Sequence, residues 1–393
     1  MRLLILTWEY PPNVVGGLGQ HVAELVPALV EQRVEIYVVT PVSSKNQVCS
    51  RLEQGVMVHR IFSPALNSEA DIYEQVVATN QLLIDHIVSL ATTYDLIHVH
   101  DWLVSFAGIA LQEKLKIPLV ATIHATERGR SRGYISSDLQ RSIDEAERRL
   151  IQEANHLIVC SHYMADEVQT FFHTSPTRLD VVPNGVDLAT LQVADSESEL
   201  AAFKTKYAEP DDLVIFSVTR LVHEKGLHLL VEAASEIFKQ CSRARIIIAG
   251  KGPEAENLKR QADHLGISSR VNFVGFISNE DRNRFYKIAT MAIFPSLYEP
   301  FGIVALEAMA LRCSVVVSDI GGLGEIVTHG ENGITIYPND AESVAWGVMR
   351  LLNYPEIGLR CAERAYRYVD ELYNWGRIAR LTRGVYRRTL VNS

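Results

Sequence analysis

Short hydrophobic runs alternate with amphipathic stretches along this chain of 393 residues. Unbroken runs rich in valine and isoleucine are typical of parallel strands covered on both faces, and the stretches between them have helical spacing. In the first half, strands are expected at Leu3–Leu6, Val34–Val39, Leu96–Val99, Leu119–Ile123 and Leu157–Cys160. In the second half, they are expected at Leu213–Val218, Arg245–Ala249, Val271–Val274, Met291–Phe294 and Ser314–Val317.

The alternation restarts after Asn184-Gly185-Val186-Asp187, and residues 192–212 lack a strong apolar run. We therefore expect a linker near residues 184–195 and two doubly wound α/β domains with parallel sheets. The first would span residues 1–188 and the second residues 189–373. Because ligands bind beyond the carboxyl ends of strands in open α/β sheets, two such domains predict a cleft between them.

Composition narrows the class of protein. Hydrophobic residues make up 47% and charged residues 22%, as in ordinary globular domains, and the net charge of −9 disfavours a broad nucleic-acid surface. The five scattered cysteines form no C-x-x-C pair, so neither a disulfide framework nor a zinc site is expected. No apolar run approaches the roughly 20 residues that span a bilayer, and Met1–Glu9 is interpreted as a buried strand, so we expect a cytoplasmic protein.

Three segments that follow strands of the first half carry candidate chemistry. The first strand leads into Gly16-Gly17-Leu18-Gly19, a loop that can bring backbone amides and a helix N-terminus to a phosphate, or that is only a tight turn. Strand ends at His98-Val99-His100-Asp101 and Thr122-Ile123-His124 place polar groups where they can bind sugar hydroxyls. Structural histidines are the alternative.

In the second half, Arg220 and Lys225 follow the strand Leu213–Val218, where two cations can neutralise a leaving diphosphate. A solvated charged loop is the alternative. No Asp-x-Asp motif occurs in the sequence, so no metal site is expected.

The stretch after Met291–Phe294 is the most informative. Pro300 fits the first turn of a helix, and Gly302 allows close approach of a ligand to backbone amides. Glu307 lies within an otherwise apolar helix, where a carboxylate is costly without a partner such as ribose hydroxyls or a buried arginine.

Glu299 and Glu307, with Pro300-Phe301-Gly302 between them, resemble the Glu-x₇-Glu motif of retaining glycosyltransferases with the GT-B fold. The chain is similar to glycosyltransferase family 4 and, more distantly, to glycogen and starch synthases. Supporting segments are Gly16-Gly17-Leu18-Gly19, His100-Asp101-Trp102, Val182-Pro183-Asn184-Gly185-Val186-Asp187, Arg220…Lys225-Gly226, Gly250-Lys251-Gly252-Pro253 and Gly321-Gly322.

The resemblance implies a role for each site residue. Glu299 and the amides of Phe301, Gly302, Ile303 and Val304 would bind the donor sugar, and Glu307 the ribose. Arg220, Lys225 and amides near Gly16 and Gly17 would bind the diphosphate. The remaining implied contacts are His124 near the transferred sugar with Asp101 beside it, the base near Lys251, Gly252, Phe276 and Ile277, and a helix at about residues 374–393 that crosses back onto the first domain.

The implied reaction is transfer of a hexose with retention of configuration, without metal or cofactor, from a nucleotide sugar to a carbohydrate or glycoconjugate acceptor. UDP-glucose is the expected donor. An ADP-glucose-dependent glycogen synthase is an alternative, which is weakened because Val14-Val15 precede Gly16-Gly17 where bacterial glycogen synthases carry Lys-x. A nucleotide-sugar epimerase, a pyridoxal-dependent phosphorylase and a non-catalytic sensor are further alternatives.

Residues 127–149 and the final segment are rich in arginine, which allows them to guide an anionic acceptor or to make weak peripheral contact with an acidic membrane. Acidic neighbours offset most of the charge in residues 127–149, so a solvated loop and helix is the favoured interpretation there.

Overall fold

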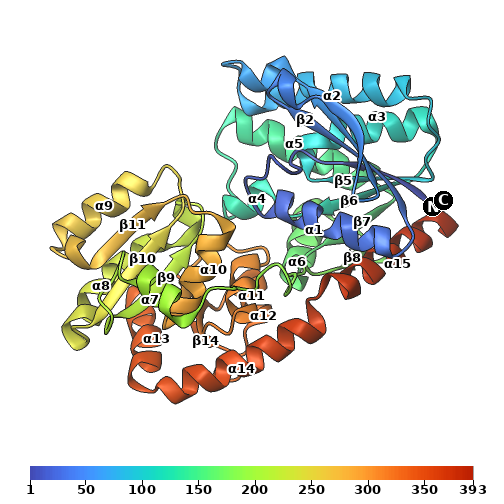
Figure 1. Cartoon of the computed structure of the whole chain (residues 1–393). Coiled ribbons are helices and arrows are strands. Elements are labelled where there is room, and N and C mark those ends of the chain that lie inside the picture. The colour runs from blue at the N-terminus through green and yellow to red at the C-terminus, as the bar shows by residue number, and fades with distance from the viewer. Residues whose placement is uncertain (393) are drawn as a thin grey trace. The chain divides into compact units, whose positions relative to one another are not determined.

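The computed structural model describes residues Met1–Asn392, which form two compact units. Unit 1 comprises Met1–Gly185 together with the helix that begins at Trp375, and unit 2 comprises Val186–Asn374 (Figure 1). Within the described residues, no helix is both long enough and apolar enough to cross a bilayer.

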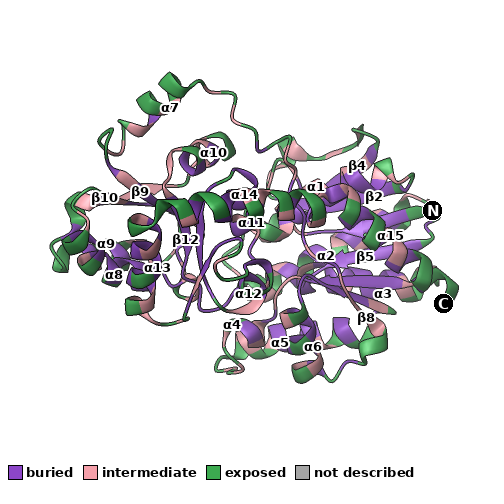
Figure 2. Ribbon diagram, turned by 90° about the horizontal axis from the view of Figure 1, so that it is seen from below, coloured by how far each residue is buried: buried purple, intermediate pink, exposed green. Residues whose placement is uncertain are grey.

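Unit 1 is built on an eight-stranded sheet with the order β3-β4-β2-β1-β5-β6-β7-β8. Neighbouring strands are parallel except for β3 and β4, which pair antiparallel at the edge. The strands are β1 (Arg2–Leu6), β2 (Glu35–Val42), β3 (Cys49–Glu53), β4 (Val56–Phe62), β5 (Leu96–His100), β6 (Leu119–Ile123), β7 (His156–Val159) and β8 (Leu179–Val181). The central strands β1, β5 and β6 are buried on both faces apart from Arg2 at the start of β1, and β5 can be followed in Figure 2.

Helices cover both faces of this sheet. They are α1 (Gly17–Glu31), α2 (Ile72–Ser89), α3 (Ser105–Leu115), α4 (Glu127–Arg130), α5 (Asp138–Glu153), α6 (His162–Phe172) and α15 (Trp375–Asn392). The helix α15 packs beside α1 (Figure 1), and Ile378, Val385 and Tyr386 join the core formed by β1 and α1. The indole N–H of Trp375 donates to the carboxylate of Glu24 on α1.

Unit 2 has a six-stranded, fully parallel sheet with the order β11-β10-β9-β12-β13-β14. Its strands are β9 (Leu213–Val218), β10 (Ala244–Ala249), β11 (Val271–Gly275), β12 (Met291–Phe294), β13 (Val315–Ser318) and β14 (Ile334–Ile336). Its helices are α7 (Glu197–Lys204), α8 (Leu227–Gln240), α9 (Ala255–His264), α10 (Asn279–Ile288), α11 (Ile303–Ala310), α12 (Gly321–Ile326), α13 (Ala341–Asn353) and α14 (Pro355–Leu372).

Local sequence signals determine where several helices begin. Ser137 and Gln140 form a capping box at the start of α5, and Ser196 and Glu199 form another at α7. Ser278 caps α10 by accepting from the amide of Asp281. This cap fixes the residue at which α10 begins.

Four strands were not predicted from the sequence. β3 and β4 form a hairpin whose turn, Gln54-Gly55, has positive φ at both residues, as type I′ turns require. β3 is an exposed polar edge strand, so no apolar run marks it. β8 and β14 have only three residues each, too short for a recognisable pattern.

Candidate functional site

The loops after β9 and β12 form one substructure in unit 2. β9 and β12 are neighbouring parallel strands, so their carboxyl ends lie at the same edge of the sheet. The carbonyl of Glu224 accepts hydrogen bonds from the amides of Leu297 (2.8 Å) and Tyr298 (3.3 Å). Gly226 has φ +65°, and a Cβ atom there would lie 1.9 Å from the carbonyl oxygen of Pro295. Glycine is therefore required for this close approach of the two loops.

Lys225 and Glu299 are joined across these loops. The Nζ atom of Lys225 lies 2.8 Å from Oε2 of Glu299, and the hydroxyl of Ser296 donates to the same oxygen at 3.2 Å. Only 15% of the Lys225 side chain and 11% of the Glu299 side chain are exposed. The structure thus brings two of the predicted site residues into direct contact, in a shielded, charge-assisted pair.

Arg220 has a different environment. Its side chain is 57% exposed, and the paired carboxylate of Glu224 lies 3.9 Å away. A guanidinium held this loosely remains available to an anionic ligand, and its planar donor fork suits a phosphate.

The segment that follows Glu299 is tightly constrained. Gly302, with φ +108°, is the N-cap of α11, and a Cβ atom there would lie 2.6 Å from Cδ2 of Leu323. The carbonyl of Glu299 accepts from the amide of Gly322, at the start of α12. The expectation that Pro300 occupies the first helical turn is wrong, because the left-handed conformation of Gly302 delays the helix until Ile303.

Glu307 is 1% exposed within α11, and its Oε1 lies 3.0 Å from NH1 of Arg282 on α10. The hydroxyl of Tyr286, one turn along α10, donates to the carbonyl of Val304 (3.0 Å). Burial, followed by the charge of Glu307, raises the pKa of Tyr286 well above its usual value. The sequence indicated that Glu307 needs a partner but did not identify Arg282, because nothing local shows that α10 packs on α11.

The residues expected near the base lie together at the ends of two neighbouring strands. Nζ of Lys251, after β10, lies 5.8 Å from the ring centroid of Phe276, after β11. The Phe276 ring is 71% exposed. The backbones next to them are joined by a hydrogen bond from the amide of Gly250 to the carbonyl of Gly275 (2.7 Å). Ile277, which follows Phe276 in the chain, is half-buried. Gly252 has no room for a Cβ, which would lie 2.2 Å from the carbonyl oxygen of Leu221.

In unit 1, α1 begins at Gly17 with Gly16 as its N-cap. The amides of Val15 (2.8 Å) and Gly16 (3.1 Å) both donate to Oε2 of Glu9. A Cβ on Gly19 would lie 2.5 Å from that same oxygen. The glycine loop therefore binds the carboxylate of Glu9. One of the amides that it occupies, that of Gly16, was expected to bind a phosphate.

Asp101 and His124 are in contact, as neighbouring strand ends allow. Oδ1 of Asp101 accepts the backbone N–H of His124 at 2.7 Å, and Asp101 has φ +59°, a strained conformation for a residue other than glycine. Burial raises the pKa of Asp101 to about 6 and lowers that of His124 to about 4. The imidazole of His124 is therefore neutral near pH 7.

Three more histidines surround His124 in the core of unit 1. Nδ1 of His100 lies 3.1 Å from Nε2 of His124, and His98 lies between the hydroxyls of Thr122 and Tyr386, at 2.7 Å from each. Nδ1 of His21 on α1 lies 2.7 Å from Oδ1 of Asn184. Burial lowers the pKa of His21, His98 and His100 well below the usual value. His21 was not expected in the site, because its position on an ordinary helix gives no signal in the sequence.

Comparison with known proteins identifies the family. The model described as Glycosyltransferase Family 4 matches residues 15–190, and the one described as Glycosyl transferases group 1 matches residues 201–368. An uncharacterised glycosyltransferase of Methanocaldococcus jannaschii is 35% identical over 390 residues, which cover 98% of each chain. The chain belongs to the family 4 glycosyltransferases.

Further relatives of this glycosyltransferase are consistent with that assignment. A glycogen synthase of Mycobacterium tuberculosis is 32% identical over 403 residues, covering 98% of this chain and 94% of that protein. The fold matches that of sucrose-phosphate synthase from Thermosynechococcus elongatus over 100% of both chains (TM-score 0.84, 22% identity). It also matches Anabaena HepE, solved in complex with UDP-glucose, over 99% of this chain and 100% of that one (TM-score 0.78, 21% identity). The predicted GT-B fold of two parallel-sheet α/β domains is confirmed.

The arginine-rich segment of the glycosyltransferase, residues 127–149, is more buried than expected. Arg128 forms a two-pronged ion pair with Asp144 on α5 (2.6 and 2.8 Å). The interpretation as a solvated loop and helix is wrong for Asp144 and Glu147, which are buried because this face of α5 packs on α3 and α4.

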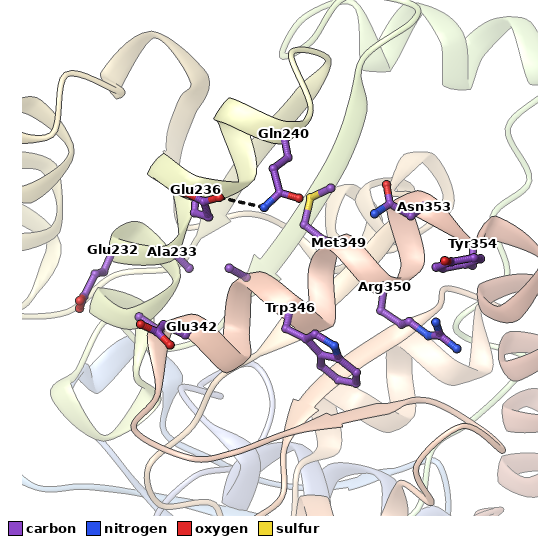
Figure 3. Close-up of a pocket in the computed structure, with 12 residues that line it drawn as sticks. Glu232, Ala233, Glu236, Gln240, Glu342, Trp346, Met349, Arg350, Asn353 and Tyr354 are labelled. Carbon is purple, nitrogen blue, oxygen red and sulfur yellow. Dashed lines mark hydrogen bonds between the residues drawn. The ribbon is translucent and has the colours of Figure 1, made fainter.

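A separate pocket of the glycosyltransferase lies between α8 and α13 in unit 2 (Figure 3). Trp346 and Met349 project from α13, and Glu236 accepts a hydrogen bond from Gln240 on α8. None of the predicted donor-binding residues lines this pocket.

Proposed function

We propose that this glycosyltransferase transfers a hexose, with glucose from UDP-glucose as donor, to a saccharide or other hydroxyl acceptor with retention of anomeric configuration. The observation that carries the proposal is the arrangement after β9 and β12, where the exposed Arg220 and the shielded Lys225–Glu299 pair share one edge of the sheet of unit 2. A nucleotide sugar needs both kinds of group: cations for its diphosphate and a carboxylate for its hydroxyls.

The diphosphate leaves with additional negative charge, which fixed cations stabilise best in the transition state. Arg220 offers a guanidinium with few competing contacts, and Lys225 is held in place by Glu299. We propose that these two side chains take the place of a divalent metal in this reaction. Lys225 would then bridge the leaving phosphate and the residue that binds the sugar.

Glu299 is suited to bind donor-sugar hydroxyls because its carboxylate is held in one orientation. Ser296 and Lys225 both donate hydrogen bonds to the same oxygen, Oε2. Its position is maintained by the constrained segment that ends at Gly302. The next two residues, Ile303 and Val304, are the first of α11. Glu307, oriented by Arg282, would accept from the ribose. The base would lie against Phe276 and Lys251.

In unit 1, the neutral imidazole of His124 is suited to accept a hydrogen bond from a sugar hydroxyl, and Asp101 positions it through the backbone. Asp101 is a positioning residue for His124 in this proposal. The departing phosphate would deprotonate the acceptor hydroxyl on the face from which it leaves, which accounts for retention without a protein nucleophile. Catalysis is then mainly positioning and electrostatic stabilisation.

Two relatives support glucose as the transferred sugar. Anabaena HepE was solved with UDP-glucose, and the Mycobacterium tuberculosis relative is named a glycogen synthase. The name of the second relative also favours glycogen synthesis as the alternative function. Val14-Val15 before Gly16 distinguishes this chain from the Lys-x loop of the bacterial enzymes and weighs against that alternative.

The test is release of nucleoside diphosphate from a panel of UDP-, ADP- and GDP-sugars, with and without glucose and oligosaccharide acceptors. We expect UDP release from UDP-glucose that depends on acceptor, and loss of that release in Glu299→Ala. Product analysis by NMR should show the α-anomer. Conversion of the donor without any acceptor would instead indicate an epimerase, and release from ADP-glucose alone would replace UDP-glucose as donor.

A further inference from the structure

Three imidazoles converge in the core of unit 1. His21 comes from α1, His100 from the end of β5, and His124 follows β6. Each offers one ring nitrogen, and the three nitrogens all lie within 4.8 Å of one another. His21 and His100 are buried, with 4% and 0% exposure, and His124 is half-buried. Neutral imidazole nitrogens in such a group are the commonest protein ligands of divalent transition metals.

The hydrogen bond of His21 prepares that ring as a ligand. Nδ1 lies 2.7 Å from the carboxamide oxygen of Asn184, which accepts and cannot donate. Nδ1 therefore carries the ring proton, and Nε2 presents a lone pair. That Nε2 atom is buried and has no hydrogen-bond partner among residues 1–392, which the structure describes. A metal-binding histidine is typically fixed in this way, with its second nitrogen donating to an oxygen acceptor.

His100 and His124 supply the other two nitrogens. Nδ1 of His100 and Nε2 of His124 lie 3.1 Å apart and share one proton, so one nitrogen donates and the other accepts. When the donor ring moves its proton to its other nitrogen, both facing nitrogens present lone pairs. No proton leaves the protein in this step.

We propose that His21, His100 and His124 bind one divalent transition-metal ion, such as Zn²⁺ or Co²⁺, in a site we call the three-histidine site. Zn–N bonds of about 2.0–2.1 Å place tetrahedral ligand nitrogens roughly 3.3 Å apart, so the widest nitrogen pair closes by ring rotation. The fourth position is left to water. Mg²⁺ and Ca²⁺ prefer oxygen ligands and do not bind there.

The test is titration of the metal-free, full-length protein with Co²⁺, followed by visible absorption and by equilibrium dialysis. We expect one Co²⁺ per chain with the intense band of a four-coordinate site, and displacement of the band by Zn²⁺ but not by Mg²⁺. His21→Gln should weaken Co²⁺ binding more than tenfold. Asn184→Ala should weaken it about 10- to 100-fold through loss of the orienting hydrogen bond.

The matched control is His59→Gln. His59 belongs to another imidazole pair of unit 1, with its Nδ1 3.2 Å from Nε2 of His86. Its replacement should leave stoichiometry, affinity and spectrum unchanged. The proposal is overturned if the wild-type protein shows no stoichiometric Co²⁺ band, if His21→Gln binds as tightly as wild type, or if His59→Gln loses the band equally. Wild-type binding alone remains decisive if a variant fails to fold.

The expected consequence for catalysis rests on the proposed function. Because His124 is a metal ligand in this site and also faces the sugar in the proposed reaction, Zn²⁺ should inhibit transfer over the same concentration range as it binds. The binding measurement uses neither donor nor acceptor. Failure of the metal site would therefore leave the transferase assignment intact, and an inactive panel of donors would leave the metal site intact.

Discussion

Nζ of Lys225 and Oε2 of Glu299 lie 2.8 Å apart although 74 positions separate them in the chain. Each residue completes the other: the lysine compensates a buried carboxylate, and the carboxylate holds the ammonium in one place. Removing either member therefore changes both the charge and the geometry of the candidate donor site.

Lys225→Ala and Arg220→Ala should separate catalysis from stability. We expect either substitution to reduce turnover by about 10²- to 10³-fold, since each removes a cation from the leaving diphosphate. Lys225→Ala should also lower the urea midpoint, because Glu299 is left buried without its ion-pair partner. Arg220→Ala should not, because that side chain is largely exposed. Turnover and urea unfolding are measured side by side, and a fully active Lys225→Ala protein would contradict the assignment.

Arg282→Met tests the buried pair with Glu307. Leaving a carboxylate at 1% exposure without its ion-pair partner should cost about 3–5 kcal/mol in the free energy of unfolding. The double variant Arg282→Met/Glu307→Gln should recover part of that loss, because no charge remains buried. Arg367→Met is the control, since it breaks an exposed pair with Glu363 and should cost less than about 1 kcal/mol. Equal losses in both single variants would contradict the prediction.

Gly302→Ala should disturb the segment that positions Glu299. The positive φ alone should cost about 1–2 kcal/mol, and the new Cβ would also lie 2.6 Å from Cδ2 of Leu323. Gly330→Ala is the matched variant, because φ is also positive there, at +73°, but no atom lies within 4 Å of the new Cβ. We expect thermal unfolding to show the larger loss for Gly302→Ala, and donor binding to weaken only in that variant.

The buried Glu147 should make stability depend on pH. Burial raises the pKa of this carboxyl to about 8, from an ordinary value of 4.5, and both of its oxygens accept from the amide of Glu127. The folded protein therefore keeps a proton that the unfolded chain releases between pH 4.5 and 8. Since the unfolded state binds fewer protons in that window, this group lowers the free energy of unfolding as pH rises, by up to about 1.4 kcal/mol per pH unit.

Glu147→Gln removes the ionisable group, so the folded and unfolded states no longer differ in proton binding at this position. Relative to wild type, the variant should become steadily more stable from pH 4.5 to 8 and then level off. Glu145→Gln, on the same helix with 76% of its side chain exposed, should run parallel to wild type. Urea unfolding at several pH values measures the difference. A constant offset between Glu147→Gln and wild type across the window would show that Glu147 ionises normally.

The sequence predicted β6, β9 and β12 with the same ends as the structure, because apolar residues dominate these strands, with Thr122 and Ser217 as buried polar exceptions. It missed β3, where an exposed edge strand carries polar residues. The expected change of domain at residues 188/189 lies three residues from the boundary between the compact units, at 185/186. A strand that is buried on both faces is thus easier to predict from the sequence than an exposed edge strand.

The candidate site was predictable only one loop at a time. Arg220, Lys225 and Glu299 each follow an apolar run, so their position at a strand end could be inferred. The pairing of Lys225 with Glu299 depends on β9 lying beside β12, and the sequence does not give strand order. The pairing of Glu307 with Arg282 depends likewise on the packing of α10 and α11. Contacts set by topology rather than by local pattern were therefore found only in the structure.

The placement of α15 has a consequence for biosynthesis. Ile378, Val385 and Tyr386 complete the core around β1 and α1, yet they follow all of unit 2 in the chain. A ribosome makes the first strand of unit 1 long before the helix that covers it. Unit 2 can consequently finish folding before unit 1. Until α15 has been synthesised, the apolar face formed by β1 and α1 stays exposed, and at this stage the chain is most open to binding by a chaperone.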